Sequence, residues 1–429
     1  MEKFTIQEGE YIPPIIEQLF KNHFNHKDIQ TKDNGSISNF SGFIILNDKL
    51  LVSFPKHFLT KSELHQSYIS SDKINFEKHS KLLFNTIYKA SSKSSVLGKE
   101  ITKDLEENFP FKAFLNVYEY YKKYGLYKKE IHTKKYGYGG EIDWKSSIEK
   151  SSLIFNNNNI IFIPLVIREK LYHYEFLSKC MAYIINSSAD ALSMFIPITK
   201  LYYDYKDIDW RNTKRIIKEL RKLLRSSFKD IDKNLILSII QFFENKNHVT
   251  NGIKIKIHTF YLIWEDMVQE YLNNYFLDIS TFTNSQNVVR HKLTFSEKPL
   301  PQKLGFLKKT FFTDARGTSG FSLELDHYLA TKSNIYIFDS KYYQKLTGLN
   351  YKQVSYYFLL NNQNNPSMNL NTYNALLLPT SRNMADFENF KYHYIHSKEF
   401  SYNNQTFFII EQYLNTLHVM NMYQNKVKQ

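Results

Sequence analysis

Three side chains in the last third of the chain have the types and spacing needed for metal-dependent hydrolysis. They are Asp326, Asp339 and Lys341, and they lie in the stretch 322–343, SLELDHYLATKSNIYIFDSKYY. Two carboxylates and an ammonium in one patch are costly unless a cation or a reaction uses them. Carboxylate oxygens are ligands that Mg²⁺ prefers, and bound Mg²⁺ activates water and clamps phosphate oxygens. The pattern favours phosphodiester hydrolysis at a divalent-metal centre.

Each of these residues has an expected role in such a centre. We expect Asp326 and Asp339 to bind the metal. We expect Lys341 to position or help deprotonate the attacking water and to stabilise the developing negative charge. A second Mg²⁺ ion is expected if Glu265, on a preceding helix, also points inward. Gln353, on the following helix, would orient Lys341 or touch the phosphate.

The chemistry depends on a β-hairpin. Two apolar β-type runs flank the polar turn 331–334. Alternate residues of a strand share a face, so Asp339 and Lys341 point the same way. Pairing of the two runs brings Asp326 beside them. Glu324 lies two residues earlier, could share the face of Asp326, and is a rival ligand.

The acid-x-Lys pattern alone is not specific, because it recurs at 143–145, 204–206 and 244–246. Asp339 differs because it ends the apolar run IYIF and has a strand-borne acid thirteen positions earlier. The competing interpretation is a structural ion pair between Asp339 and Lys341 at a strand end.

The elements around the hairpin predict an α/β fold. Apolar spacing predicts helices over 258–276 and 351–360, strands over 374–380 and 405–410, and a terminal helix from 411. With the hairpin this gives one mixed sheet flanked by helices. A mixed α+β region precedes it.

The rest of the chain is expected to form two further regions. Residues 42–54 read as a β-hairpin and residues 61–130 as mostly helical, while glycines mark a turn at 137–140. A buried strand is expected within 160–167. The polar stretch 244–254 marks a boundary. We predict three domains: a hairpin and helical region (1–135), a central mixed region that could dock a partner (136–250), and the catalytic domain (251–429).

Residues 215–228, RIIKELRKLLRSSF, predict an amphipathic helix with a strongly basic face. Two interpretations remain open, a solvated surface and a DNA-contacting surface. The net charge of +14 likewise fits either a polyanion partner or a lysine-rich surface.

Composition excludes several classes of protein. A single cysteine, Cys180, rules out a disulfide or a thiolate zinc cluster within one chain. No signal core and no long apolar run occur, so we expect a cytoplasmic protein without a membrane span. Neither phosphate-binding glycine motif occurs, which argues against nucleotide binding through a P-loop.

These motifs resemble those of known nucleases. The pattern Asp326-x(12)-Asp339-x-Lys341 followed by Gln353-xxx-Tyr357 resembles the PD-(D/E)xK nuclease superfamily, with its restriction-endonuclease-like fold. YLIWEDMVQEYL, FDSKYY and NALLLP together are similar to the LlaJI family of restriction endonucleases, which resemble McrC. GFIILNDKLLVSFPKHF and GGEIDWKSSI are similar to that family's upstream segments. Leu325 stands where a proline often precedes the first aspartate of the superfamily motif.

The resemblance implies the roles of the site residues and a partner. Asp326 and Asp339 would be metal ligands, with Asp339 in place of the more common glutamate, and Lys341 the catalytic lysine. Glu265 matches the helix-borne acid and Gln353 the accessory glutamine. McrC-like subunits bind a GTP-driven, McrB-like hexameric motor that translocates DNA, and residues 1 to about 250 would dock to it.

The leading hypothesis is a Mg²⁺-dependent endonuclease that cuts double-stranded DNA as a subunit of a restriction-modification or McrBC-like system in phage defence. The alternatives are a stand-alone repair or transposition nuclease of the same fold, and a basic nucleic-acid-binding scaffold without catalysis.

Overall fold

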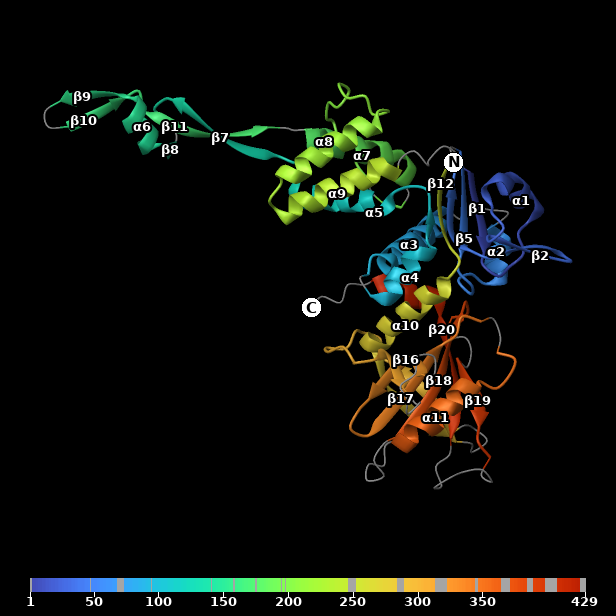
Figure 1. The fold of residues 1–429 in the computed structure, drawn as a ribbon. Coiled ribbons are helices and arrows are strands. Elements are labelled where there is room, and N and C mark those ends of the chain that lie inside the picture. The colour runs from blue at the N-terminus through green and yellow to red at the C-terminus, as the bar shows by residue number, and fades with distance from the viewer. Residues whose placement is uncertain are drawn as a thin grey trace. The chain divides into compact units, whose positions relative to one another are not determined.

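The computed structural model has a mixed α/β fold, as predicted, with several β-sheets and helices packed on them (Figure 1). Among the residues that it describes, no helix is both long and apolar enough to cross a membrane. The described residues run from 2 to 424 except 47, 68–72, 94, 140, 157–158, 174–175, 194, 197, 246–251, 284–288, 313–321, 344–345, 364–370, 384–388 and 398–406.

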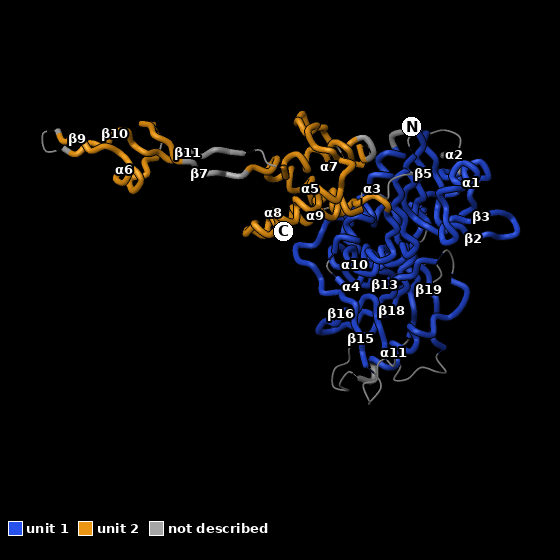
Figure 2. Tube along the Cα trace, turned by 45° about the horizontal axis from the view of Figure 1, so that its top comes forward, with its two compact units in different colours: residues 1–107, 251–429 blue, residues 108–250 orange. Residues whose placement is uncertain are grey.

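The chain divides into two compact units (Figure 2). Unit 1 comprises residues 1–107 and 251–429, and unit 2 comprises residues 108–250. The sequence-based boundary after residue 250 coincides with a unit boundary. The one after residue 135 falls inside a strand of unit 2, β7 (Lys129–Tyr136).

Long-range strand pairing explains why the N-terminal and C-terminal regions form one unit. Strand β12 (Ile253–Ile257) pairs antiparallel with β4 (Ser41–Ile45) and with β6 (Glu106–Glu107). The close approach of β12 requires Gly42, whose φ is +140° and whose added Cβ would lie 2.0 Å from the carbonyl oxygen of Ile255. In the sequence, unit 2 is therefore inserted between β6 and β12, two strands of the same sheet.

The N-terminal part of unit 1 is built on a five-stranded sheet of order β1-β5-β4-β12-β6. The predicted hairpin is present as the antiparallel pair β4 and β5, and Asn47 of its turn lies outside the described residues. Helix α1 packs on this sheet through Ile16 and Phe20. The elements not yet given are β1 (Glu2–Gln7), α1 (Pro14–Phe20), η1 (Lys21–His23), β2 (Ile29–Lys32), β3 (Gly35–Ser38), β5 (Lys49–Phe54), α2 (Lys61–Ser67), α3 (Lys73–Ser91) and α4 (Val96–Asp104).

The C-terminal part of unit 1 contains a six-stranded mixed sheet of order β15-β16-β17-β18-β20-β19. Strands β17, β18 and β20 are parallel, and their other neighbours are antiparallel. The elements are α10 (Phe260–Tyr275), β13 (Phe276–Thr283), β14 (Val289–Phe295), β15 (Leu307–Phe312), β16 (Ser322–Ala330), β17 (Asn334–Ser340), α11 (Tyr351–Gln363), β18 (Asn371–Thr380), β19 (Phe390–Ile395), β20 (Phe408–Asn415) and α12 (Thr416–Gln424).

The two faces of this sheet are covered by different elements. Helix α11 packs on one face, where Tyr356 and Leu360 contact Ile335 and Ile337 (Figure 1). The intervening residues of β17 point to the opposite face, toward α10 and the start of β13. There the ring of Phe338 lies against that of Phe276, with 5.6 Å between the ring centroids. Strand β17 is thus buried on both sides, as its apolar run predicts.

Two sequence-based expectations about elements are wrong. The terminal helix begins at Thr416 and not at residue 411, because residues 411–415 continue the parallel pairing of β20 with β18. The strand expected within 160–167 is two strands, separated by the cis peptide bond before Pro164.

Unit 2 combines a helical body with β-ribbons. Helices α8 and α9 pack together, and Trp210 stacks on Tyr183 of α7 with ring centroids 4.2 Å apart. The elements are α5 (Phe111–Tyr124), β7, β8 (Glu141–Ile142), α6 (Trp144–Lys150), β9 (Ser152–Asn156), β10 (Asn159–Ile163), β11 (Val166–His173), α7 (Phe176–Leu192), α8 (Thr213–Ser226) and α9 (Asp230–Asn245).

Candidate active site

The structure places Asp326 and Asp339 opposite each other on neighbouring antiparallel strands. In β16 and β17, His327 pairs with Phe338, and the same register puts Asp326 across from Asp339. The Asp326 carboxylate also accepts a hydrogen bond from the backbone N–H of Ser340 at 3.1 Å. Asp339 is only 6% exposed. The hairpin therefore brings the two predicted ligands together at the end of a buried strand.

Lys341 lies directly against this acid pair. Its Nζ is 2.5 Å from Oδ2 of Asp339, which agrees with the predicted common face. Its backbone N–H donates to the carbonyl of Leu377 in β18 at 2.9 Å, so the residue is anchored just beyond the strand end. The side chain of Lys341 is one fifth exposed.

Burial and mutual repulsion separate the pKa values of the two carboxyl groups. Burial raises the pKa of Asp326, and the hydrogen bond to Asp339 and the charge of Asp339 raise it further. Burial also opposes ionisation of Asp339, but the hydrogen bond from Asp326 and the charge of Lys341 outweigh it and lower its pKa. The pair therefore shares one proton near neutral pH.

Glu265 lies within electrostatic reach of this pair, on α10. Burial raises the pKa of Glu265, and the charge of Asp339 raises it further. Lys308 of β15, whose Nζ is 3.4 Å from the Glu265 carboxylate, opposes this increase. Glu265 is thus the third acid of the cluster, and Lys308 is a second nearby cation that the sequence did not single out. The rival ligand Glu324 is exposed, whereas Asp326 is the acid that interacts with Asp339.

Gln353 is fully buried at the start of α11. Within the described part of the chain, neither its amide nitrogen nor its amide oxygen has a hydrogen-bond partner. The predicted contact with Lys341 is not among the described interactions. A buried amide without a partner costs about 1–3 kcal/mol, so the structure carries a polar group that packing does not explain.

The variant Gln353→Met separates a structural role from a functional one. Because methionine removes the unsatisfied amide at similar volume, we expect the variant to be about 1 kcal/mol more stable in urea unfolding. If the amide serves the site, the activity of the site should fall at the same time. Gln18→Met, at an exposed position of helix α1, is the matched control and should change neither property. Loss of stability in Gln353→Met would instead indicate a hydrogen-bonded structural glutamine.

His327 connects the acid pair to α10 and was missed by sequence reasoning. Its Nε2 lies 2.7 Å from Oγ of Ser340, and its Nδ1 lies 2.5 Å from Oε1 of Gln269. Because the Gln269 amide nitrogen donates to the carbonyl of Phe306, its oxygen is left to accept from Nδ1–H. His327 is therefore a neutral imidazole that holds Ser340, whose N–H binds Asp326. Its polar character in a strand next to Asp326 was the available signal.

The burial of His327 predicts a pH dependence of stability. Burial lowers its pKa to about 3, from about 6.5 in the unfolded chain. Between these values the unfolded chain binds a proton that the folded protein does not, so stability falls as the pH drops below about 6.5, by about 1.4 kcal/mol for each pH unit. When the free energy of unfolding in urea is measured between pH 7.5 and 5.5, it should fall less steeply with pH in His327→Asn than in the parent protein. Equal pH slopes for the variant and the parent protein would contradict the prediction.

The competing acid-x-Lys positions have other partners. Asp143 caps α6, and Lys134 at 2.8 Å, the N–H of Ser146 and Arg168 at 3.0 Å hold the pKa of its carboxyl far below the usual range. Glu244 pairs with Arg221 at 2.9 Å. These two acids serve a helix end and a surface ion pair, and Asp204 accepts a hydrogen bond from the backbone N–H of Lys206 at 3.1 Å. Asp339, in contrast, lies opposite Asp326 and within electrostatic reach of Glu265.

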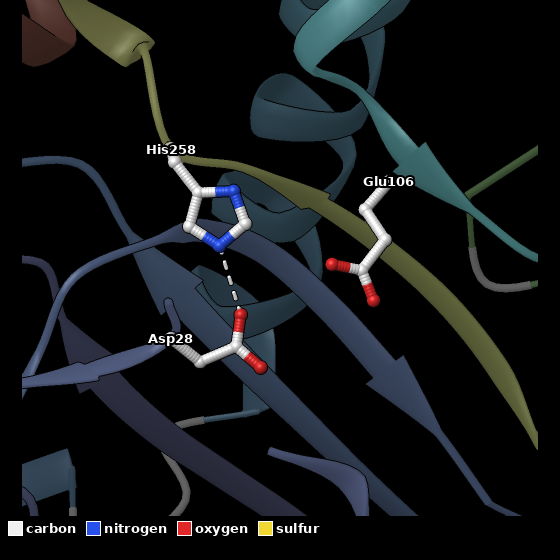
Figure 3. Close-up of side chains that lie close together, drawn as sticks. All are labelled: Asp28, Glu106 and His258. Carbon is white, nitrogen blue, oxygen red and sulfur yellow. Dashed lines mark hydrogen bonds and ion pairs between the residues drawn. The ribbon is translucent and has the colours of Figure 1, made fainter. Parts of the chain in front are cut away.

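A second cluster contains residue types that can bind metals, and no sequence motif indicated it. Asp28, Glu106 and His258 come together from three distant parts of unit 1, with 2.9 Å between Oδ1 of Asp28 and Nε2 of His258 (Figure 3). Lys256 already supplies a cation here, because its fully buried Nζ is 2.5 Å from Oδ2 of Asp28. The cluster is a structural node that joins β12, β6 and the segment before β2 through Lys256.

The residues around Asp326 fit a hard divalent cation better than those of the second cluster do. The donors are the carboxylate oxygens of Asp326 and Asp339, which lie opposite each other and whose mutual repulsion a cation would relieve. Asp28, by contrast, has both oxygens engaged by Lys256 and His258. The candidate metal ligands are therefore Asp326 and Asp339, with Glu265 as a candidate third.

Comparison with solved structures gives a distant likeness in overall fold. No protein-family model and no curated protein matches the sequence. A chain of the solved half-complex from a tetradecameric assembly of Thermococcus gammatolerans McrB AAA+ hexamers with bound McrC is similar over 99% of this chain and 97% of that chain, with 10% identity and a TM-score of 0.39. This likeness is too low to support a functional argument. The relation to the LlaJI family stays a prediction.

Proposed function

We propose that this protein is a divalent-metal-dependent endonuclease that hydrolyses phosphodiester bonds in double-stranded DNA. The observation that carries the proposal is the pair Asp326 and Asp339, which lie opposite each other on neighbouring strands, with Lys341 2.5 Å from the buried Asp339. A structural ion pair needs one acid for one lysine, whereas this site gathers a second and third acid. Excess buried carboxylates with perturbed pKa values are typical of sites that bind a cation.

The side chains have distinct roles in the proposed reaction. Asp326, Asp339 and Glu265 would hold Mg²⁺, one or two ions, which supplies Lewis-acid activation of water and phosphate when bound. Lys341 donates hydrogen bonds to the developing charge on the phosphate and orients the water with its accessible ammonium. His327 fixes Ser340 and thereby the direction of the Asp326 carboxylate. Lys308 adds positive charge at the outer edge of the cluster.

We further propose that the protein acts with a GTP-hydrolysing, McrB-like motor as a subunit of a restriction system in the cytoplasm. Support comes from the resemblance of the Asp326 hairpin, the Gln353 helix and the segment WEDMVQEYL to McrC-like nucleases. The sequence has no P-loop motif, which fits a subunit that relies on a partner for nucleotide hydrolysis.

The test is cleavage of linear and supercoiled duplex DNA with Mg²⁺ or Mn²⁺, with excess EDTA as the control. Each reaction is run with and without a GTPase encoded next to the gene, plus GTP. Cleavage that needs metal, partner and GTP supports the whole proposal. Robust cleavage without partner or GTP would point to a stand-alone nuclease, and no cleavage under any of these conditions to a binding scaffold.

A further inference from the structure

We propose that helix α8 of unit 2 is a contact surface for the sugar-phosphate backbone of double-stranded DNA. This inference rests on the proposed function only for the choice of DNA as the polyanion. The surface itself is defined by the basic residues of α8. The helix carries six basic side chains and one acidic side chain over 14 residues. All six basic residues are exposed, namely Lys214, Arg215, Lys218, Arg221, Lys222 and Arg225.

Five of these residues form one continuous stripe. Successive helix positions turn by about 100°, so the spacings of four, three, one and three residues place the five within an arc of about 100°. We call these five residues the α8 stripe: Lys214, Lys218, Arg221, Lys222 and Arg225. At about 1.5 Å per residue the stripe is about 16 Å long. Phosphates recur at about 3.4 Å along each DNA strand, so the stripe matches the phosphates of about five base pairs.

Few acids neutralise the stripe. Glu219 pairs with Lys222 and Glu244 with Arg221, each at 2.9 Å. Among the described residues, no carboxylate forms an ion pair with the other three members, Lys214, Lys218 and Arg225. Three uncompensated cations on one helix face therefore remain to contact phosphates.

The charge of the whole molecule is concentrated in the same unit. Residues 108–250 contain 24 Lys and Arg against 15 Asp and Glu, a net charge of +9. The remaining 286 residues carry the other +5 of the total of +14. If the basic residues were spread evenly over the surface, unit 2, which is the smaller unit, would carry the smaller part of the net charge. The positive charge of the chain is thus concentrated in unit 2, whereas the acid cluster of Asp326, Asp339 and Glu265 belongs to unit 1.

The packing of α8 favours nucleic acid over a membrane. A helix that binds an anionic membrane inserts an exposed apolar face beside its basic residues. In α8 the apolar side chains are turned toward the protein, because Ile216 and Leu220 are buried, Ile217, Leu223 and Leu224 are half-buried, and the helix packs against α9. What the helix presents outward is charge, which suits the phosphate backbone.

The test compares two triple variants of the full chain that lose the same charge. One is Lys214→Ala, Lys218→Ala and Arg225→Ala. The control is Lys112→Ala, Lys145→Ala and Lys150→Ala, at three exposed positions of unit 2 outside α8. Binding of a fluorescent 30-base-pair duplex is measured by anisotropy in EDTA from 50 to 300 mM KCl. Because EDTA prevents metal-dependent cleavage, a failure of the proposed catalysis leaves this result unaffected.

The stripe variant should bind at least 10-fold more weakly at 50 mM KCl, and its slope of log affinity against log salt should shrink by about 2.7, or about 0.9 for each lost phosphate contact. The control should stay within 2-fold of the parent protein. Alanine favours helix formation, so circular dichroism should be unchanged. Equal affinity of the stripe variant and the parent, equal loss in both triples, or stripe-dependent binding to phosphatidylserine vesicles in place of DNA would overturn the inference.

Discussion

Lys341→Ala is expected to lower the rate of metal-dependent DNA cleavage by about 100-fold to 10,000-fold, the range typical for a lost proton-transfer group. The ammonium is the one basic group in contact with Asp339 among the described residues, so no neighbour can take its place. Asp339→Ala should abolish cleavage, because it removes the ligand that is ionised near neutral pH. Initial rates on a labelled duplex at saturating Mg²⁺ measure both effects.

The controls separate chemistry from folding and binding. Lys332→Ala, in the exposed turn between β16 and β17, removes the same charge and should cleave at the parent rate. Both site variants should keep the melting temperature of the parent within a few degrees and still bind duplex DNA. Full cleavage by Lys341→Ala or Asp339→Ala would mean that the acid pair is a structural ion pair and that the active centre lies elsewhere.

Asp28→Ala is expected to destabilise unit 1 by about 3–5 kcal/mol, because it leaves the charge of Lys256 buried without its partner. The side chain of Lys256 is 0% exposed and donates to Asp28 at 2.5 Å. The double variant Asp28→Ala with Lys256→Met should recover most of the loss, since neither charge then remains buried. Urea midpoints followed by tryptophan fluorescence, in which Trp264 reports on unit 1 and Trp144 and Trp210 on unit 2, compare the three proteins.

The same variants decide between a structural node and a metal site. A structural node predicts that zinc, manganese and EDTA leave the urea midpoint of the parent protein unchanged. If zinc raised that midpoint and Asp28→Ala removed the increase, Asp28, Glu106 and His258 would be metal ligands, and Lys256 would be only a neighbour.

The local parts of the site could be predicted from the sequence. Strand alternation placed Asp339 and Lys341 on one face, and the apolar runs around 331–334 brought Asp326 opposite them. Helix α10 followed from its apolar spacing within two residues at its N-terminal end. These features depend on periodicity and on a short turn, which a sequence displays directly.

The parts that depend on distant pairing could not be predicted. Asp28, Glu106 and Lys256 meet only because β12 inserts between β4 and β6, and no local pattern reports that pairing. Lys308 reaches Glu265 from a strand with an irregular register against β16. Residues 411–415 follow the helical period but extend a strand, because an adjacent parallel strand offers them backbone partners.

The insertion of unit 2 also sets the order in which the chain can fold during synthesis. Strand β6 ends at Glu107, but its partner β12 begins at Ile253. A ribosome that adds about 5–20 residues per second needs roughly 7–30 s to make the chain between them. Throughout this time β4 lacks one of its two neighbours, and by the end of it every strand and helix of unit 2 has been made. The second unit in the sequence is thus the first that can complete its fold, and the six-stranded sheet of unit 1 is the last.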